Sequence, residues 1–153
     1  MTPPAWPQGD GIAALIPHQG RMCLLDAVLD CTPSRIRCRA SSHRAADHPL
    51  RSPLGLLAPV GIEYAAQAMA LHWALNAAPG VQGRPGFLAS ARSVRLQVAR
   101  LDDVVGDLLV SAEHLAGDER QAMYRFELHD EQGRLLVDGR ATVVLDTPLM
   151  APA

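Results

Sequence analysis

Apolar and polar residues alternate most regularly in residues 35–40, where Ile36, Cys38 and Ala40 would share one face of an extended segment. The intervening positions are all arginine, and this period of two predicts a half-buried strand. Residues 22–29 are mostly apolar and predict a buried strand that breaks at Thr32 and Pro33. The chain is therefore expected to begin with two strands, after a single helical turn at residues 12–16.

Residues 60–78 have the composition of a buried helix. Alanine and leucine predominate, and no glycine or proline lies between Gly61 and Pro79. Apolar residues lie nearly all round this helix, which is typical of a helix enclosed by the rest of its domain. Pro59 suits the first turn, and the pair Pro79-Gly80 predicts the end. The Pro- and Gly-rich residues 41–59 before the helix predict a long loop, of the kind that is more often functional than idle.

After the helix, every segment has the pattern of a strand. Strands are expected at residues 86–98, 107–115, 122–128 and 135–145, with hairpin-like turns at 117–119 and 130–133. We expect these four to form an antiparallel meander, and one long helix is covered fully only if such a sheet curls around it. The predicted fold class is α+β, with a curled antiparallel sheet around one long central helix. Residues 1–153 form one domain, with loose termini at 1–10 and 147–153.

Composition and charge exclude several classes of function. The formal net charge is -2 and no stripe of Lys or Arg is present, so we expect no nucleic-acid partner. The longest apolar stretch, residues 65–75, contains Gln67 and His72 and is too short to cross a bilayer. The N-terminus has no signal-peptide pattern, so a cytoplasmic location without membrane insertion is expected. The 3 cysteines and 6 histidines have no trusted metal-ligand spacing, and we expect reduced thiols and no metal site.

Two titratable residues stand out as candidates for chemistry. Glu63 lies in the first turn of an otherwise apolar helix, where a buried carboxylate is costly unless it is paired or protonated. Its simpler role is to complement the positive end of the helix dipole. Gln67 follows one turn later on the same face, where its amide would hold the Glu63 carboxyl in one orientation. His48 lies in the long loop, where a lone histidine is usually an exposed polar residue.

Four segments resemble motifs of the FabZ-type 3-hydroxyacyl-acyl carrier protein dehydratases, in the same order along the chain. They are residues 16–26 (IPHQGRMCLLD, similar to LPHR-x-P-M-L-L-x-D), the loop pair His48-Pro49, residues 61–67 (GIEYAAQ, similar to E-A-x-A-Q) and residues 105–108 (VGDL, similar to P-G-D-x-L). Residues 60–64 (VGIEY) and 86–88 (GFL) are closer still to the ApeP branch, the dehydratases of aryl polyene biosynthesis. The resemblance runs from about residue 16 to residue 145.

This resemblance implies a hot-dog fold and dehydration of 3-hydroxyacyl thioesters, held on acyl carrier protein, to trans-2-enoyl thioesters. In that family the two catalytic groups face each other across a dimer interface. By similarity, His48 would remove the α-proton, and Glu63, kept protonated by burial, would protonate the β-hydroxyl. The substrate-binding positions implied are His18, Ala58, Val60, Gly61 and Gln67, with backbone N–H groups at the helix start polarising the thioester carbonyl.

The resemblance also implies which partners and cofactors take part. Acyl carrier protein would deliver the substrate on its own phosphopantetheine arm, so the chain itself needs no cofactor. The second hot-dog subunit would come from a homodimer or from a heterodimer with a different hot-dog protein.

Two departures from the family pattern leave alternatives open. The loop has Asp47-His48-Pro49-Leu50 where the family usually has Gly-His-Phe-Pro. Pro59 has no N–H group, which leaves Ala58 as the expected oxyanion donor. These changes motivate a second hypothesis, a non-catalytic hot-dog subunit that pairs with an active dehydratase subunit. A hot-dog acyl thioesterase is the third hypothesis, although such enzymes usually lack a paired loop histidine.

Overall fold

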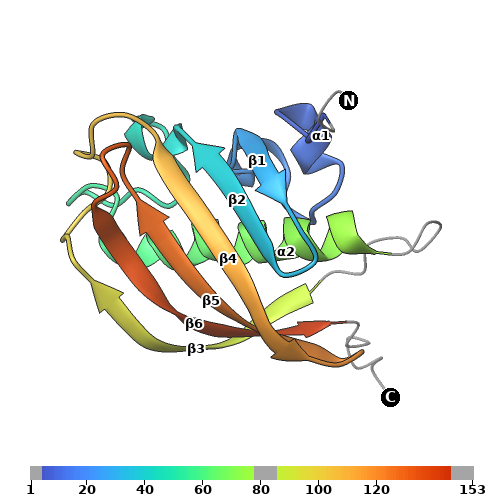
Figure 1. The fold of residues 1–153 in the computed structure, drawn as a ribbon. Helices are drawn as coiled ribbons and strands as arrows, with labels where there is room; N and C mark the ends of the chain where they lie inside the picture. The colour runs from blue at the N-terminus through green and yellow to red at the C-terminus, as the bar shows by residue number, and fades with distance from the viewer. Residues whose placement is uncertain (1–4, 78–85, 146–153) are drawn as a thin grey trace, which may run out of the picture.

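The computed structural model describes residues 5–77 and 86–145, and it contains one long helix beside one six-stranded antiparallel sheet (Figure 1). The strands are β1 (Ala27–Cys31), β2 (Arg35–Ala40), β3 (Gly86–Leu96), β4 (Leu108–Gly117), β5 (Gln121–His129) and β6 (Leu135–Leu145). Their spatial order is β1-β2-β4-β5-β6-β3. The short helices are α1 (Asp10–Ala13) and the 3-10 turns η1 (Gly20–Met22), η2 (Ser42–Arg44) and η3 (Ala58–Val60).

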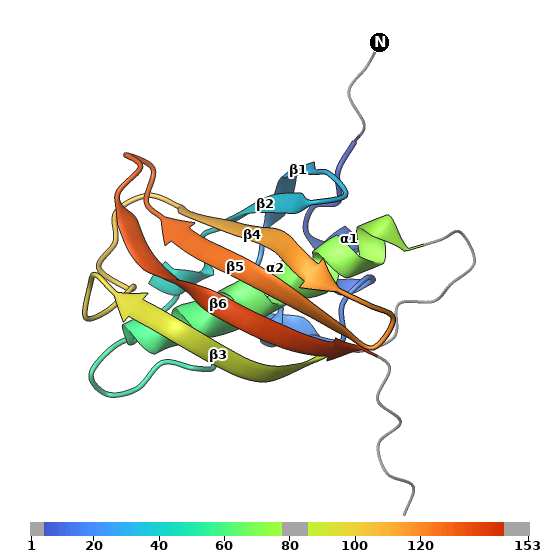
Figure 2. The same cartoon turned by 60° about the horizontal axis from the view of Figure 1, so that its bottom comes forward.

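Helix α2 (Gly61–Asn76) lies along the inner face of the sheet, which curves around it (Figure 2). Pro59 occupies the 3-10 turn that leads into the helix, as its fixed φ and missing N–H favour. Tyr64, Ala65 and Leu71 are fully buried, and the helix packs against β2, β4 and β5. The predicted central helix and curled sheet are therefore confirmed; residue 78, the last of the predicted helix, lies outside the described residues.

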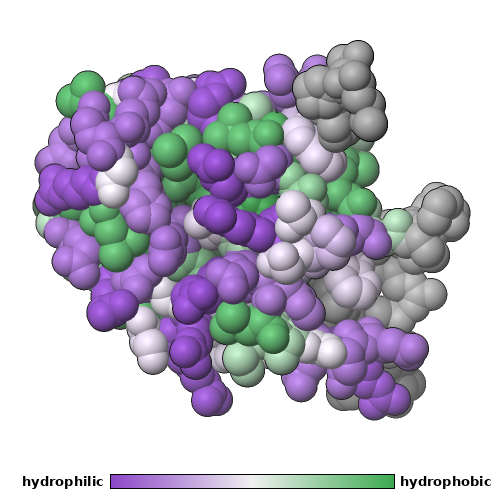
Figure 3. All heavy atoms as spheres, in the orientation of Figure 1, coloured by the Kyte–Doolittle hydropathy of each residue, from purple (hydrophilic) through white to green (hydrophobic). Residues whose placement is uncertain are grey.

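The strands alternate between a buried inner face and an exposed outer face. Ile36, Cys38 and Ala40 of β2 are fully buried, as the sequence pattern predicts. Ile36 pairs with Ala112 and Cys38 with Val110, so the apolar positions of β2 and β4 share the face that covers α2. The opposite face is mostly hydrophilic (Figure 3). One layer of side chains between helix and sheet thus forms the core.

The predicted four-stranded meander is wrong in one respect. Strands β4, β5 and β6 form a meander, but β3 pairs with β6 and not with β4. The segment between β3 and β4 crosses to the loop before α2, where Leu57 bridges to Arg100 and Leu101 donates to the Leu56 carbonyl. This crossing places β3 and β4 on opposite sides of the β5–β6 pair.

The first strand is shorter than the sequence predicts. The pattern favours residues 22–29, but residues 20–22 form a 3-10 turn and β1 begins at Ala27. The reason is that side chains satisfy the intervening backbone. The Leu24 N–H donates to the side chain of Gln67, and the Leu24 carbonyl accepts from Ser42. A backbone bonded in this way cannot join a ladder.

The described part of the N-terminal segment is packed rather than loose. Gly9 donates to the Asp26 carbonyl, Val28 donates to the Pro7 carbonyl, and Gln8 bridges to Ala27. Ile12 of α1 is fully buried. These contacts correct the expectation of a loose segment for residues 7–10, because two backbone bonds and one apolar anchor hold it against β1; the segment 147–153 lies outside the described residues.

Helices in the described ranges are all too short or too polar to cross a membrane. Cys23, Cys31 and Cys38 are free thiols, of which Cys38 is buried, and this burial raises the pKa of Cys38 to about 12. A thiol with so high a pKa is inert. In the parts of the chain that the structure describes, no cluster of three or more His, Cys, Asp or Glu side chains is arranged to hold a metal ion.

Candidate functional site

Glu63 projects from the first turn of α2 toward the segment that joins α1 to η1. Its Oε1 atom lies 2.8 Å from Nε2 of His18 and 3.3 Å from Nε2 of Gln67. The side chains of His18 and Glu63 retain 25% and 30% of their full exposure, so the pair is shielded but still reachable. The structure therefore brings together three of the residues implied for the site.

Gln67 is held so that only one of its orientations is possible. Its Oε1 accepts from the Leu24 N–H at 2.9 Å, and its Nε2 donates to the Met22 carbonyl at 2.7 Å. The remaining N–H of the amide therefore points at Glu63, one turn earlier on the helix. The predicted role of Gln67 in orienting Glu63 fits this geometry, and the anchors come from residues 22–24.

The protonation state of Glu63 differs from the expected one. We expected burial to raise its pKa, but the pKa is lowered, first because His18 donates a hydrogen bond to the carboxylate and further because Gln67 does. Burial acts in the opposite direction and does not prevail. Donors that stabilise the charged form outweigh partial desolvation here, so Glu63 is a carboxylate at neutral pH.

His48 lies in the loop between η2 and η3 and is buried, with 5% of its surface exposed. Its Nε2 lies 3.1 Å from the Tyr64 hydroxyl, and its Nδ1 accepts from the Leu50 N–H at 3.0 Å. Burial lowers the pKa of His48, and nearby His43 and Arg51 act in the same direction, so the ring is neutral. Within the described residues, no hydrogen bond or ion pair joins His48 to Glu63.

Tyr64 is a site residue that the sequence analysis missed. It is fully buried, and its hydroxyl lies 2.7 Å from the Ser42 hydroxyl as well as near His48. Ser42 in turn donates to the Leu24 carbonyl at 2.8 Å. A tyrosine in the first turn of an alanine-rich buried helix is a signal in itself, because a buried phenol needs a hydrogen-bond partner.

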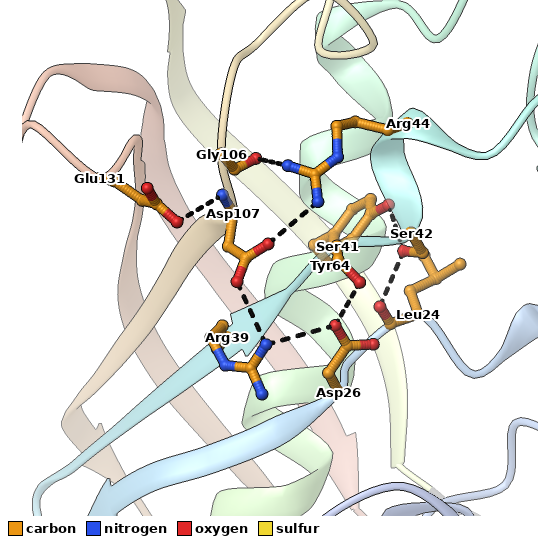
Figure 4. Close-up of polar contacts among 10 residues, drawn as sticks. All are labelled: Leu24, Asp26, Arg39, Ser41, Ser42, Arg44, Tyr64, Gly106, Asp107 and Glu131. Atoms are coloured by element: carbon orange, nitrogen blue, oxygen red, sulfur yellow. Dashed lines mark hydrogen bonds and ion pairs between the residues drawn. The ribbon is translucent and has the colours of Figure 1, made fainter.

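A polar network holds the segment that carries Ser42 (Figure 4). Arg39 and Arg44 both bond the carboxylate of Asp107, at 3.1 Å and 3.2 Å. Arg39 also approaches Asp26, which accepts from the Ser41 hydroxyl. The turn that follows β2 is thereby tied to the start of β4 and to the residue before β1, which keeps Ser42 against the Tyr64 hydroxyl (Figure 4).

The helix start does not offer the oxyanion donor that was expected. The Ala58 N–H donates to the Ala99 carbonyl at 3.0 Å, and the Val60 N–H donates to the Leu57 carbonyl at 3.0 Å. Ala58 is engaged because the loop before α2 pairs with the segment after β3. Gly61 is buried, and a methyl group there would lie 3.2 Å from Leu128 and 3.3 Å from Val137, so the helix start packs directly on the sheet.

Comparison with protein families gives a match along nearly the whole chain. The family model described as ApeP-like, ApeP dehydratase, matches residues 11–150. A search of curated protein sequences found no match. The matched range includes His18, His48, Glu63 and Gln67.

Solved structures with similar folds include a dehydratase complex and two thioesterases. The dehydratase heterocomplex ApeI:P from Xenorhabdus doucetiae is 24% identical, with 89% of this chain and 91% of that chain covered and a TM-score of 0.74. Thioesterase HI1161 from Haemophilus influenzae is 14% identical, covering 83% and 82%, with a TM-score of 0.58. Zebrafish thioesterase superfamily member 2 is 18% identical, covering 88% and 92%, with a TM-score of 0.57. These likenesses confirm the predicted hot-dog fold.

Proposed function

The chain belongs to the ApeP-like family of dehydratases, and from this membership we propose that it dehydrates 3-hydroxyacyl thioesters to trans-2-enoyl thioesters. The substrate is carried by acyl carrier protein, and the pathway is that of aryl polyenes or a related, fatty-acid-like synthesis in the cytoplasm. The phosphopantetheine arm of the carrier presents the acyl chain, so the proposed reaction needs no cofactor of its own. His48 and Glu63 are the acid-base pair of this proposal.

The observation that carries the proposal is the fixed carboxylate at the start of α2. Elimination of water requires a group that takes the α-proton and a group that returns a proton to the leaving β-hydroxyl. Glu63 is oriented by His18 and Gln67 and remains partly exposed, as a proton-transfer group must be. A carboxylate that served only the helix dipole would need no such pair of side-chain donors.

We further propose that a second hot-dog subunit completes the site. In one chain, His48 and Glu63 each bond their own neighbours and not each other. Strand β3 lies at the sheet edge, where Leu88 and Leu96 are 40% and 46% exposed. Unpaired edges with apolar side chains are favourable surfaces for association. The similar ApeI:P structure is itself a heterocomplex, which supports a partner of the same fold.

The direct test follows conversion of a 3-hydroxyacyl carrier protein by mass spectrometry, with the purified chain alone and with a hot-dog partner subunit. We expect loss of one water from the acyl group and formation of an enoyl thioester. Glu63→Gln, which keeps the shape but not the charge, should reduce turnover by about 100-fold or more. Wild-type turnover by this variant would contradict the proposal.

A second candidate function is a non-catalytic subunit that supports an active hot-dog partner. It is favoured by one observation, that both ring nitrogens of His48 are engaged inside the chain. Under this hypothesis the isolated chain has no turnover, and Glu63→Gln leaves the activity of the mixed complex unchanged. Release of free thiol without enoyl product would instead indicate a thioesterase.

A further inference from the structure

We propose that Tyr64 and Ser42 are positioning residues that hold His48 as a neutral hydrogen-bond donor, with its proton on Nε2. This reverses the part that the family resemblance implies for this histidine, which is to accept a proton. The structural half of the inference, that His48 is neutral with its proton on Nε2, is independent of the proposed function. The catalytic half, that this positioning supports turnover, rests on the proposed function.

The first end of the hydrogen-bond chain is fixed by a backbone donor. The Leu50 N–H lies 3.0 Å from Nδ1 of His48, and an amide nitrogen in a peptide can only donate. Nδ1 must therefore be the unprotonated nitrogen of the ring. In a neutral imidazole the proton then lies on Nε2, which makes Nε2 the donor to the Tyr64 oxygen 3.1 Å away.

The other end is fixed by a backbone acceptor. The Leu24 carbonyl can only accept, so the Ser42 hydroxyl donates to it at 2.8 Å. The Ser42 oxygen is then free to accept from the Tyr64 hydroxyl at 2.7 Å. Tyr64 keeps its proton throughout, because burial raises its pKa to about 12. All the protons from Leu50 to Leu24 therefore point in one direction.

Reversing this chain is unfavourable at both ends. With the proton on Nδ1, the ring would set an N–H group of His48 against the Leu50 N–H. At the far end, Ser42 would donate to Tyr64 and leave the Leu24 carbonyl without its side-chain donor. Both losses occur in a largely buried region, where an unpaired polar group is costly. The donor form of His48 is thus selected by two backbone groups that flank the site.

The consequence concerns which group in the chain is able to take a proton. His48 has no nitrogen free to accept a proton in this arrangement. It would act on the substrate by directing its Nε2–H to a substrate oxygen in place of the Tyr64 hydroxyl, as neutral imidazoles do when they polarise an oxygen. Glu63, the residue before Tyr64, is the group that is held in its acceptor state, so it would take the α-proton and, once protonated, return a proton to the leaving β-hydroxyl. One turn of α2 therefore carries both the carboxylate and the anchor of the histidine.

Nitrogen NMR of the histidine rings tests the structural half without any substrate. We expect His48 to be neutral and protonated on Nε2 at neutral pH. Tyr64→Phe should shift the His48 signals and speed exchange of the Nε2 proton with water. Tyr124→Phe is a matched control, because it removes a buried hydroxyl that lies 2.8 Å from Nδ1 of a different histidine, His72. It should perturb His72 and leave His48 unchanged.

Ser42→Ala provides a second variant should Tyr64→Phe fail to fold, because it removes the acceptor of the Tyr64 hydroxyl and keeps the ring. A proton on Nδ1 of His48, a charged ring at neutral pH, or a His48 spectrum indifferent to both variants overturns the inference.

Turnover of the carrier-bound substrate tests the catalytic half. We expect Tyr64→Phe to lower kcat by about 10-fold with little change in KM, a part of the roughly 100-fold or more that a positioned proton-transfer group contributes. Tyr124→Phe should retain wild-type kcat. An unchanged kcat in Tyr64→Phe refutes the catalytic role of the positioning. Absence of turnover in every form, wild type included, both alone and with a hot-dog partner subunit, refutes the proposed function instead, and the NMR result still decides the tautomer.

Discussion

Histidine residues on the two sides of the site differ because their ring nitrogens have different neighbours. Nε2 of His18 lies against a carboxylate, and its Nδ1 is buried without a partner among the described residues. His48 instead lies between a backbone N–H and a phenol, and both of its nitrogens are occupied. The same side-chain type thus stabilises a charge at one position and is a fixed donor at the other, as ring tautomers depend on their partners.

Replacing His18 by alanine should raise the pKa of Glu63. The His18 hydrogen bond is the largest cause of the lowered pKa, and burial alone acts in the opposite direction. A carboxyl with a lowered pKa adds stability above its ordinary pKa and loses it as the pH falls through the lowered value. In His18→Ala, the free energy of unfolding should therefore fall less steeply as the pH is lowered into the acid range. Carbon NMR titration of the Glu63 carboxyl measures the shift directly.

His129→Ala is the control for this prediction. His129 is also partly exposed and lies 3.6 Å from a glutamate, Glu127, but on β5. It should leave the titration of Glu63 unchanged. A Glu63 pKa that stays low in His18→Ala would mean that Gln67 and the helix dipole suffice to hold the carboxylate.

The loop before α2 is fastened to the segment after β3 by one carboxylate. Asp102 accepts from the Leu56 N–H at 3.0 Å and from Nε of Arg100 at 2.9 Å. Gly55 has a φ of 106°, and a Cβ there would lie 2.8 Å from both Arg100 and Asp102, so only glycine permits this approach. These bonds of Asp102 to Leu56 and Arg100, called the Asp102 clamp below, fix the residues that lead into α2 and through them the position of Glu63.

Asp102→Asn should loosen the Asp102 clamp and lower the melting temperature by about 3 °C or more at neutral pH. Pairing with Arg100 holds the pKa of Asp102 well below its ordinary value. The stabilisation is therefore present above the ordinary pKa of aspartate and is lost as the pH falls through the lowered one. The melting temperatures of the wild type and the variant should therefore become equal at acid pH, which thermal unfolding measured across a pH series checks.

Asp103→Asn is the matched control, because Asp103 is the neighbouring carboxylate, is 66% exposed and only approaches Arg100 at 4.0 Å. It should change stability little at any pH. Equal losses in the two variants would mean that general charge near Arg100, and not the buried bonds of Asp102, stabilises the loop.

At the scale of the whole molecule, periodicity predicted where the helix and strands lie in the sequence better than which strands lie side by side in the sheet. The alternation in β2 and the alanine-rich α2 are local properties, and both appear where the pattern placed them. The position of β3 beside β6 depends on a crossing segment with no sequence period. The occupied N–H of Ala58 depends on a partner 41 residues away (99 minus 58), which no local pattern reveals.

The site was predictable only in part, because local spacing reveals contacts within one element but not contacts between distant segments. Glu63 and Gln67 share a helix face, so their contact follows from spacing alone. The contact of His18 with Glu63 and that of Tyr64 with His48 join segments far apart in sequence or in different elements. The first contact gives Glu63 the opposite protonation state from the expected one, because its hydrogen-bond donors outweigh burial. The second leaves the neutral His48 ring without a nitrogen that is free to accept a proton.

The proposed sharing of the site between subunits leads to a prediction for mixed variants. His48→Ala and Glu63→Gln should each have little turnover alone if the chain forms homodimers. In a one-to-one mixture about half of random dimers are hybrids, and each hybrid has one intact site of two. About a quarter of wild-type turnover should therefore return, provided that one site uses His48 of one subunit and Glu63 of the other. Mixing His48→Ala with the double variant is the control, because no intact site can form. Activity at the control level would contradict a site shared between copies of this chain, and recovery only with a different hot-dog subunit would assign the missing half to that partner.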